Sequence, residues 1–152
     1  MKFAEVLGHN SAKERIVRMV DGDAIPHALL LHGEIGIPKL ALARAMAQYI
    51  HCENKQNGDS CGKCASCLQH QSFNHGDTFF SFPIVKKASV DAKKACSDDF
   101  ILEWKTFLTE NPLVEDYEKW LEVMKSENAQ PIIYVGESAN IVHKMSLSSM
   151  TS

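Results

Sequence analysis

Four cysteines at a narrow spacing constrain the fold of this chain more than any other feature. The sequence contains five cysteines, and four of them form the pattern C-x8-C-x2-C-x2-C: Cys52, Cys61, Cys64 and Cys67. Two successive C-x2-C steps bring thiolates onto one ion, and four sulfurs satisfy a tetrahedral Zn²⁺ without leaving an open coordination position. We therefore predict a structural zinc ion, held by these four residues, that folds a loop over residues 52–67 with few apolar side chains of its own.

A disulfide framework is the alternative interpretation of the same cysteines. The N-terminus lacks the apolar stretch of a secretory signal peptide, and no run of 18 apolar residues predicts a membrane span. A chain without a secretion signal belongs in the reducing cytoplasm, so we favour zinc over disulfides. Three histidines lie close by in sequence, His51, His70 and His75. Any of them could replace a cysteine as ligand or hydrogen-bond to one, but we expect them to be exposed or to cap helices, because four cysteines already complete the site.

Composition places the chain among ordinary globular proteins. It has 152 residues, 45% of them hydrophobic, and a net charge of −3. This length supports one domain with a real core. Since no basic stripe is present, the sequence argues against a module that binds duplex DNA by itself.

A strand, a glycine loop and a helix follow one another near the N-terminus. The short apolar run 27–32 is bounded by Pro26 and Gly33, which predicts a strand buried on both faces of a parallel sheet. Apolar residues at helical spacing after Pro38 predict a helix with proline at its first position. This succession is typical of the opening of an α/β nucleotide-binding unit.

Further elements are expected along the rest of the chain. Ser11 and Glu14 have the spacing of a capping box and predict the start of a helix that ends near Gly22. Residues 78–85 and 131–135 are candidate strands or extended segments. Helical spacing of apolar residues predicts three more helices, over residues 98–110, 117–124 and 137–145.

The loop between the first strand and its helix aligns with the phosphate-binding pattern G-x-x-x-x-G-K-[ST], but two positions fail. The aligned residues that define it are Gly33, Gly36, Pro38, Lys39 and Leu40. Pro38 replaces the second glycine and has no N–H to donate, while Leu40 replaces the hydroxyl that binds Mg²⁺. We predict a vestigial nucleotide loop without catalytic residues, which argues against ATP as a ligand; residual anion binding at the helix start stays open as an alternative.

These features together resemble the N-terminal AAA+ module of the bacterial DNA polymerase III clamp-loader subunits, gamma/tau and delta prime. The resemblance is carried by residues 3–8, by residues 27–33, by the loop and by the cysteine pattern, and it covers residues 1–77. Beyond them, residues 86–130 look like a helical insertion. The resemblance implies an α/β fold of the P-loop NTPase type, with a parallel sheet, flanking helices and an inserted zinc-binding loop.

Pro38 and Leu40 match the delta prime type, whose loop is degenerate. The resemblance then implies a non-catalytic cytoplasmic subunit of the DNA polymerase III holoenzyme, a DNA-directed DNA polymerase. Its partners would be the gamma/tau and delta subunits and, through the assembled complex, the sliding clamp and primer-template DNA. The family's acidic strand and its Ser-Arg-Cys motif are not in this sequence, so we expect the serine-rich end over 146–152 to mark a truncated module.

Two other functions remain open from the sequence. One is a gamma/tau-type subunit that hydrolyses ATP. The other is a free-standing zinc-loop module that binds nucleic acid.

Overall fold

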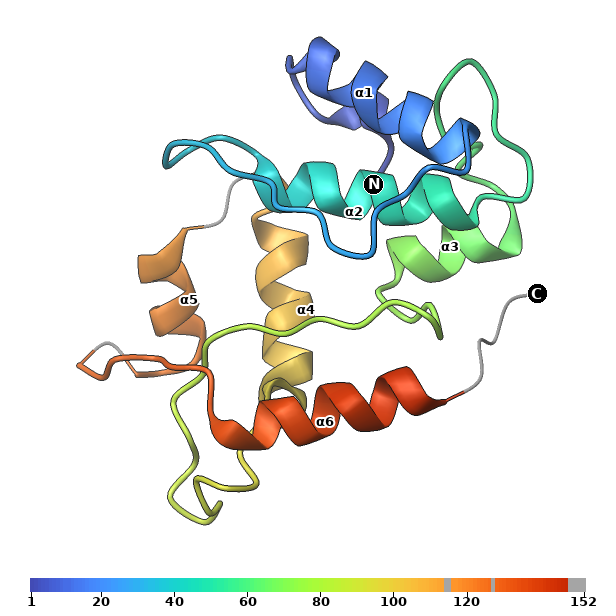
Figure 1. Cartoon of the computed structure of the whole chain (residues 1–152). Coiled ribbons are helices and arrows are strands. Elements are labelled where there is room, and N and C mark those ends of the chain that lie inside the picture. The colour runs from blue at the N-terminus through green and yellow to red at the C-terminus, as the bar shows by residue number, and fades with distance from the viewer. Residues whose placement is uncertain (114–115, 127, 148–152) are drawn as a thin grey trace. The chain divides into compact units, whose positions relative to one another are not determined.

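The computed structural model describes residues 1–113, 116–126 and 128–147 (Figure 1). Regular structure in these ranges is helical. The α-helices are α1 (Asn10–Asp21), α2 (Lys39–His51), α3 (Ala65–Gln71), α4 (Ile101–Glu110), α5 (Tyr117–Val123) and α6 (Val135–Ser146), with short 3₁₀ turns at Phe3–Glu5 and Ser97–Phe100. None of the helices in the described ranges has both the length and the apolar character that crossing a bilayer requires.

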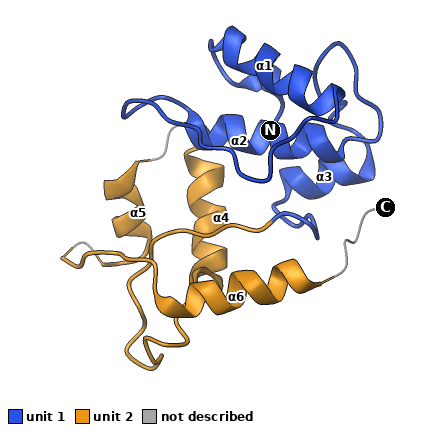
Figure 2. Cartoon of the chain, viewed as in Figure 1, with its two compact units in different colours: residues 1–78, 112–115 blue, residues 79–111, 116–152 orange. Residues whose placement is uncertain are grey.

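The chain separates into two compact units (Figure 2). The first comprises residues 1–78 and 112–115, and the second comprises residues 79–111 and 116–152. The boundary falls next to the end of the stretch 1–77 that resembles the clamp-loader subunits. Both the phosphate-type loop and the cysteine pattern lie in the first unit.

The core of the first unit forms where α2 packs against α1 and α3. Leu42, Ala45, Met46 and Tyr49 recur at helical spacing on α2 and are buried, as the sequence predicts. Phe3, Val6 and Ile16 complete this core from the N-terminal turn and α1. The buried Tyr49 hydroxyl donates to Asp21 Oδ1 at 2.8 Å, which joins the ends of α2 and α1.

Aromatic side chains fill the core of the second unit. Trp104 stacks on Phe82 with ring centroids 4.2 Å apart and meets Trp120 edge to face at 5.0 Å. The Trp120 indole N–H donates to Pro83 O at 2.8 Å, so the polar end of this buried ring is satisfied. These contacts hold α4 and α5 of this unit together. The two helices predicted over 98–110 and 117–124 are confirmed, the first as a 3₁₀ turn followed by α4 and the second as α5.

The predicted parallel sheet is not observed. The described part of the chain contains no sheet strand, only two isolated antiparallel bridges, Gln56 with Asp59 and Ile84 with Ile132. Residues 27–32 form an irregular segment, and Leu30 in it is 84% exposed. A parallel strand exists only where a neighbouring strand takes up its N–H and C=O groups, and the described residues supply no such neighbour.

The helix boundaries also differ from the sequence expectation by a few residues. The N-cap of α1 is His9 in a left-handed conformation without a side-chain cap, so the capping box that starts at Ser11 is wrong. Pro38 is the N-cap of α2 and does not occupy its first turn. The last helix begins at Val135, and the end of the serine-rich segment, residues 148–152, lies outside the described residues.

Candidate metal centre

The four cysteines meet in the first unit although they come from different local structures. Cys52 caps the C-terminus of α2, Cys64 caps the N-terminus of α3, Cys67 lies in the first turn of α3, and Cys61 lies in the loop between the helices. Their Sγ atoms all lie within 4.8 Å of one another. Tetrahedral zinc with Zn–S bonds of about 2.3 Å needs sulfurs about 3.8 Å apart, and Cys61 Sγ lies 3.9 Å from Cys67 Sγ. The cluster therefore has the donor set and the spacing to bind one metal ion.

The backbone around Cys61 forms a turn that presents N–H groups to sulfur. Gly62 has a φ of +73°, which a glycine adopts without strain. This turn lets Lys63 N and Cys64 N donate to Cys61 Sγ at 3.4 and 3.3 Å, while Cys61 N donates to Cys52 Sγ at 3.2 Å. The backbone donors lower the pKa of Cys61 to about 6, so this residue is a thiolate at neutral pH.

Cys67 has the opposite electrostatic environment. Its side chain is fully buried, and this burial raises the pKa of the Cys67 thiol to about 12. A buried thiol of this kind keeps its proton until a cation replaces it, so metal binding at the cluster releases protons. The affinity of the cluster for metal therefore rises with pH.

Polar contacts, rather than apolar packing, anchor the loop that carries Cys61. Gln56 and Asp59 exchange backbone hydrogen bonds of 2.9 Å, and the Asp59 carboxylate accepts from Phe3 N and Ala4 N at 2.9 and 3.0 Å. Ser60 accepts from the buried Gln48 amide at 2.8 Å. A metal ion bound at the cysteine cluster would add a crosslink to these contacts.

Three histidines converge in the same unit. The expectation that they would be exposed is wrong, whereas His51 does cap its helix, because it bonds to Ala47 O in the last turn of α2. The ring nitrogens of His51, His70 and His75 that face one another lie within 4.8 Å. His75 is buried and the other two are half-buried. Burial, together with the neighbouring His75 and His51, lowers the pKa of His70 to about 3. The sequence carried a signal for this group, since His51 adjoins Cys52 and His70 lies one turn after Cys67 on α3.

The lysine of the phosphate-type loop, Lys39, forms hydrogen bonds within the loop itself. Lys39 Nζ donates to Glu34 O at 2.8 Å and to Ile37 O at 3.5 Å, so its ammonium group is turned toward carbonyl oxygens of the loop. Gly36 has a φ of +90°, which completes the tight turn. The loop therefore satisfies the lysine internally.

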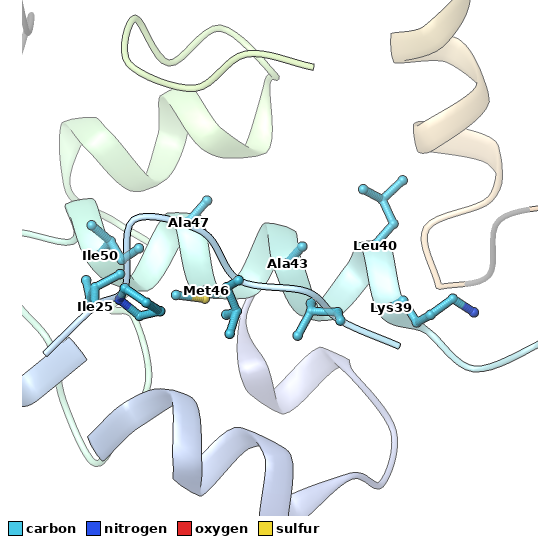
Figure 3. Close-up of a pocket in the computed structure, with 10 residues that line it drawn as sticks. Ile25, Lys39, Leu40, Ala43, Met46, Ala47 and Ile50 are labelled. Carbon is cyan, nitrogen blue, oxygen red and sulfur yellow. The ribbon is translucent and has the colours of Figure 1, made fainter. Parts of the chain in front are cut away.

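The surface beside this loop is apolar. A pocket of about 480 Å³ lies along α2, and Lys39 is the one charged residue among the ten that line it. Leu40, Ala43 and Ala47 point to the same side of α2 (Figure 3). Leu40 thus extends an alanine-rich helix face at the position where a phosphate loop carries its Mg²⁺ ligand.

A family model decides the relationship that these features suggest. The model described as DNA polymerase III, delta subunit, matches residues 8–145. The chain belongs to this family. The expected relationship to the clamp-loader subunits is confirmed.

Individual relatives of this delta subunit family protein match it over part of its length. It is 32% identical to DNA polymerase III subunit gamma/tau of Mycoplasma pneumoniae over 104 residues, which cover 68% of this chain and 15% of the relative. It is 38% identical to DNA polymerase III subunit delta' of Yersinia pestis over 64 residues, which cover 42% of this chain and 19% of the relative. The chain thus spans less than a fifth of the length of these two relatives. No solved structure matches it.

Proposed function

We propose that this chain is a delta prime-type subunit of the DNA polymerase III clamp loader. In this role it does not hydrolyse ATP; it acts with the gamma/tau and delta subunits in the cytoplasm to load the sliding clamp on primer-template DNA during replication. Residues 33–40 are then the degenerate P-loop of an AAA+ module, and residues 86–130 are an insertion in that module. The observation that carries the proposal is the internal bonding of Lys39.

A phosphate loop that binds ATP uses a lysine, backbone N–H groups and a hydroxyl ligand for Mg²⁺, and this loop differs at each of the three. The lysine of such a loop neutralises the β- and γ-phosphates, whereas Lys39 Nζ donates to Glu34 O and Ile37 O. Pro38 has no N–H for a phosphate oxygen. Leu40 offers a methyl surface in place of a hydroxyl for Mg²⁺. These three differences support a loop that shapes the start of α2 without binding ATP.

The cysteine cluster fits a clamp-loader subunit of either type, because the cysteine pattern is part of the resemblance to both. We assign it a zinc ion held by Cys52, Cys61, Cys64 and Cys67, because four thiolates match tetrahedral zinc. Four protein ligands leave no position for water or substrate, so the ion would stabilise the loop between α2 and α3 and take no part in a reaction.

A gamma/tau-type subunit is the second candidate, and one observation favours it. The match to the gamma/tau subunit of Mycoplasma pneumoniae extends over 104 residues, against 64 for the delta' subunit of Yersinia pestis. A subunit of that type requires Lys39 to leave its carbonyl partners when Mg·ATP binds.

Calorimetry with Mg·ATP distinguishes the two candidates. We expect no heat of binding for the chain, and the same result for Lys39→Ala, because Lys39 has no phosphate to bind. Micromolar affinity that Lys39→Ala abolishes would refute the delta prime assignment and support the gamma/tau type. In a clamp loader assembled with its gamma/tau and delta partners, Lys39→Ala should leave ATP turnover unchanged.

A further inference from the structure

Three successive segments of the first unit bring three imidazoles together next to the cysteine cluster. His51 is the last residue of α2, His70 lies near the C-terminus of α3, and His75 follows in the loop after α3. The positions of the first two are fixed by the same helices that carry Cys52 and Cys67. The packing of α2 against α3 therefore determines where these imidazoles lie.

The three rings form a compact arrangement. His51 Nδ1 lies 3.0 Å from His70 Nε2, and the two rings are stacked with centroids 5.1 Å apart and an interplanar angle of 22°. His75 lies face-on to both, with centroids 4.3 Å from His51 and 4.2 Å from His70. The ring nitrogens that face one another lie within 4.8 Å, a separation from which modest ring rotations reach the roughly 3.4 Å between nitrogens bound to one tetrahedral ion.

The hydrogen bonds of these rings leave nitrogens that a ligand can use. His51 Nδ1 lies 3.0 Å from both Ala47 O and His70 Nε2, so its proton faces two acceptors and the lone pair of the neutral His51 ring is on Nε2. A metal-binding histidine commonly donates its other ring N–H to a backbone carbonyl in this manner.

His75 carries a buried nitrogen that no described residue satisfies. Its Nδ1 accepts from Asp77 N at 3.2 Å, so the proton of the neutral ring is on Nε2. The residue is only 5% exposed, so water does not readily reach this nitrogen, and Nε2 has no hydrogen-bond partner among the described residues. An unpaired buried polar atom is costly, and it points to a group that the site accommodates.

We propose that His51, His70 and His75 form a second metal site, distinct from the cysteine cluster, that takes a divalent transition metal ion such as Zn²⁺. Neutral imidazoles suit Zn²⁺, Cu²⁺ and Ni²⁺, and three of them leave one coordination position open to water or to a further ligand. Binding turns the rings out of their stacked arrangement. The proton of His75 moves from Nε2 to Nδ1, and the long contact from Asp77 N is lost.

Titration of the reduced full chain with Co²⁺ tests the proposal. We expect two equivalents to bind. One produces the intense thiolate-to-cobalt charge-transfer bands of the cysteine cluster, and the other produces only weak ligand-field bands, because its ligands are nitrogen and oxygen. His70→Gln and His75→Gln should each remove the second equivalent and leave the thiolate bands unchanged.

Controls make the outcome decisive even if one variant is destabilised. His27→Gln changes an exposed histidine outside the cluster and should retain both equivalents. His70→Gln alters a half-buried side chain, so it decides the test if the buried His75→Gln fails to fold. A single equivalent in the unaltered chain, or a second equivalent that survives both cluster variants, would show a histidine stack without a metal and would overturn the proposal.

Nuclear magnetic resonance chemical shifts report directly whether the histidine rings bind the metal. With Zn²⁺ as the probe, the ring ¹⁵N signals of the three histidines should shift in the second equivalent and not in the first. The Asp77 amide signal should shift with them, since its contact with His75 Nδ1 breaks. An Asp77 signal that does not change during the second equivalent would contradict ligation by His75 Nε2.

Discussion

Replacing Cys67 with serine tests the cysteine cluster at its most buried sulfur. Cys67 Sγ lies 3.9 Å from Cys61 Sγ, close to the spacing that one tetrahedral ion imposes. Structural zinc sites bind their ion with an apparent free energy of about 10–16 kcal/mol at neutral pH. If four thiolates share it equally, one accounts for about 2.5–4 kcal/mol, which weakens zinc binding by about two to three orders of magnitude.

Competition with a chromophoric chelator measures this change in the reduced protein. The matched control is Cys96→Ser, because Cys96 is half-buried in the second unit and lies outside the cluster. We expect Cys96→Ser to bind zinc as tightly as the unaltered chain. An unchanged zinc affinity in Cys67→Ser, or an equal loss in both variants, would refute the four-cysteine site.

Three further predictions concern packing, a buried hydrogen bond and pH. Phe107→Ala should lower the free energy of unfolding by about 3–5 kcal/mol in urea titrations, because this ring is 1% exposed among the tryptophans, whereas Leu102→Ala on the exposed side of the same helix should change it by less than about 0.5 kcal/mol. Tyr49→Phe removes the 2.8 Å hydrogen bond to Asp21 and should cost about 1–2 kcal/mol; Asp21→Asn keeps an acceptor and should cost less. The folded chain lowers the pKa of His70 from 6.5 to about 3, so the unfolded chain binds the extra proton between these values. Stability should therefore rise with pH across that window and level off above it, and a slope that His70→Gln leaves unchanged would contradict this assignment.

The helices show how much local sequence pattern determines. Apolar residues at helical spacing predicted α2, and Leu42, Met46 and Tyr49 are buried on the face that the spacing indicates. The same reasoning placed α4 and α5 correctly, since amphipathic spacing is a property of the segment itself. It failed at the start of α1, because capping depends on backbone geometry at His9 that the Ser11 spacing does not reveal.

The spacing of the cysteines predicted correctly that their sulfurs lie close together, again because the pattern is local in sequence. The two C-x2-C steps lie within a few residues of one another, and the turn at Gly62 and the start of α3 hold their three sulfurs close together. Long-range partners are different. The sequence could not show that Asp59 bonds to the N-terminal turn, or that Gln48 bonds to Ser60.

The helices, the cysteine group and the family relationship could be predicted from the sequence, because each of them depends on residues that are near neighbours or on the order of motifs. The conformation of residues 27–32 could not be predicted in the same way. An apolar segment becomes a strand only when another segment pairs with it, and the described residues contain no such partner, so this segment is irregular. Tertiary structure decided this, and it also decided that Lys39 bonds to its own loop and that three histidines meet beside the cysteines. Those contacts depend on how the chain turns in space, and no periodicity in the sequence encodes them.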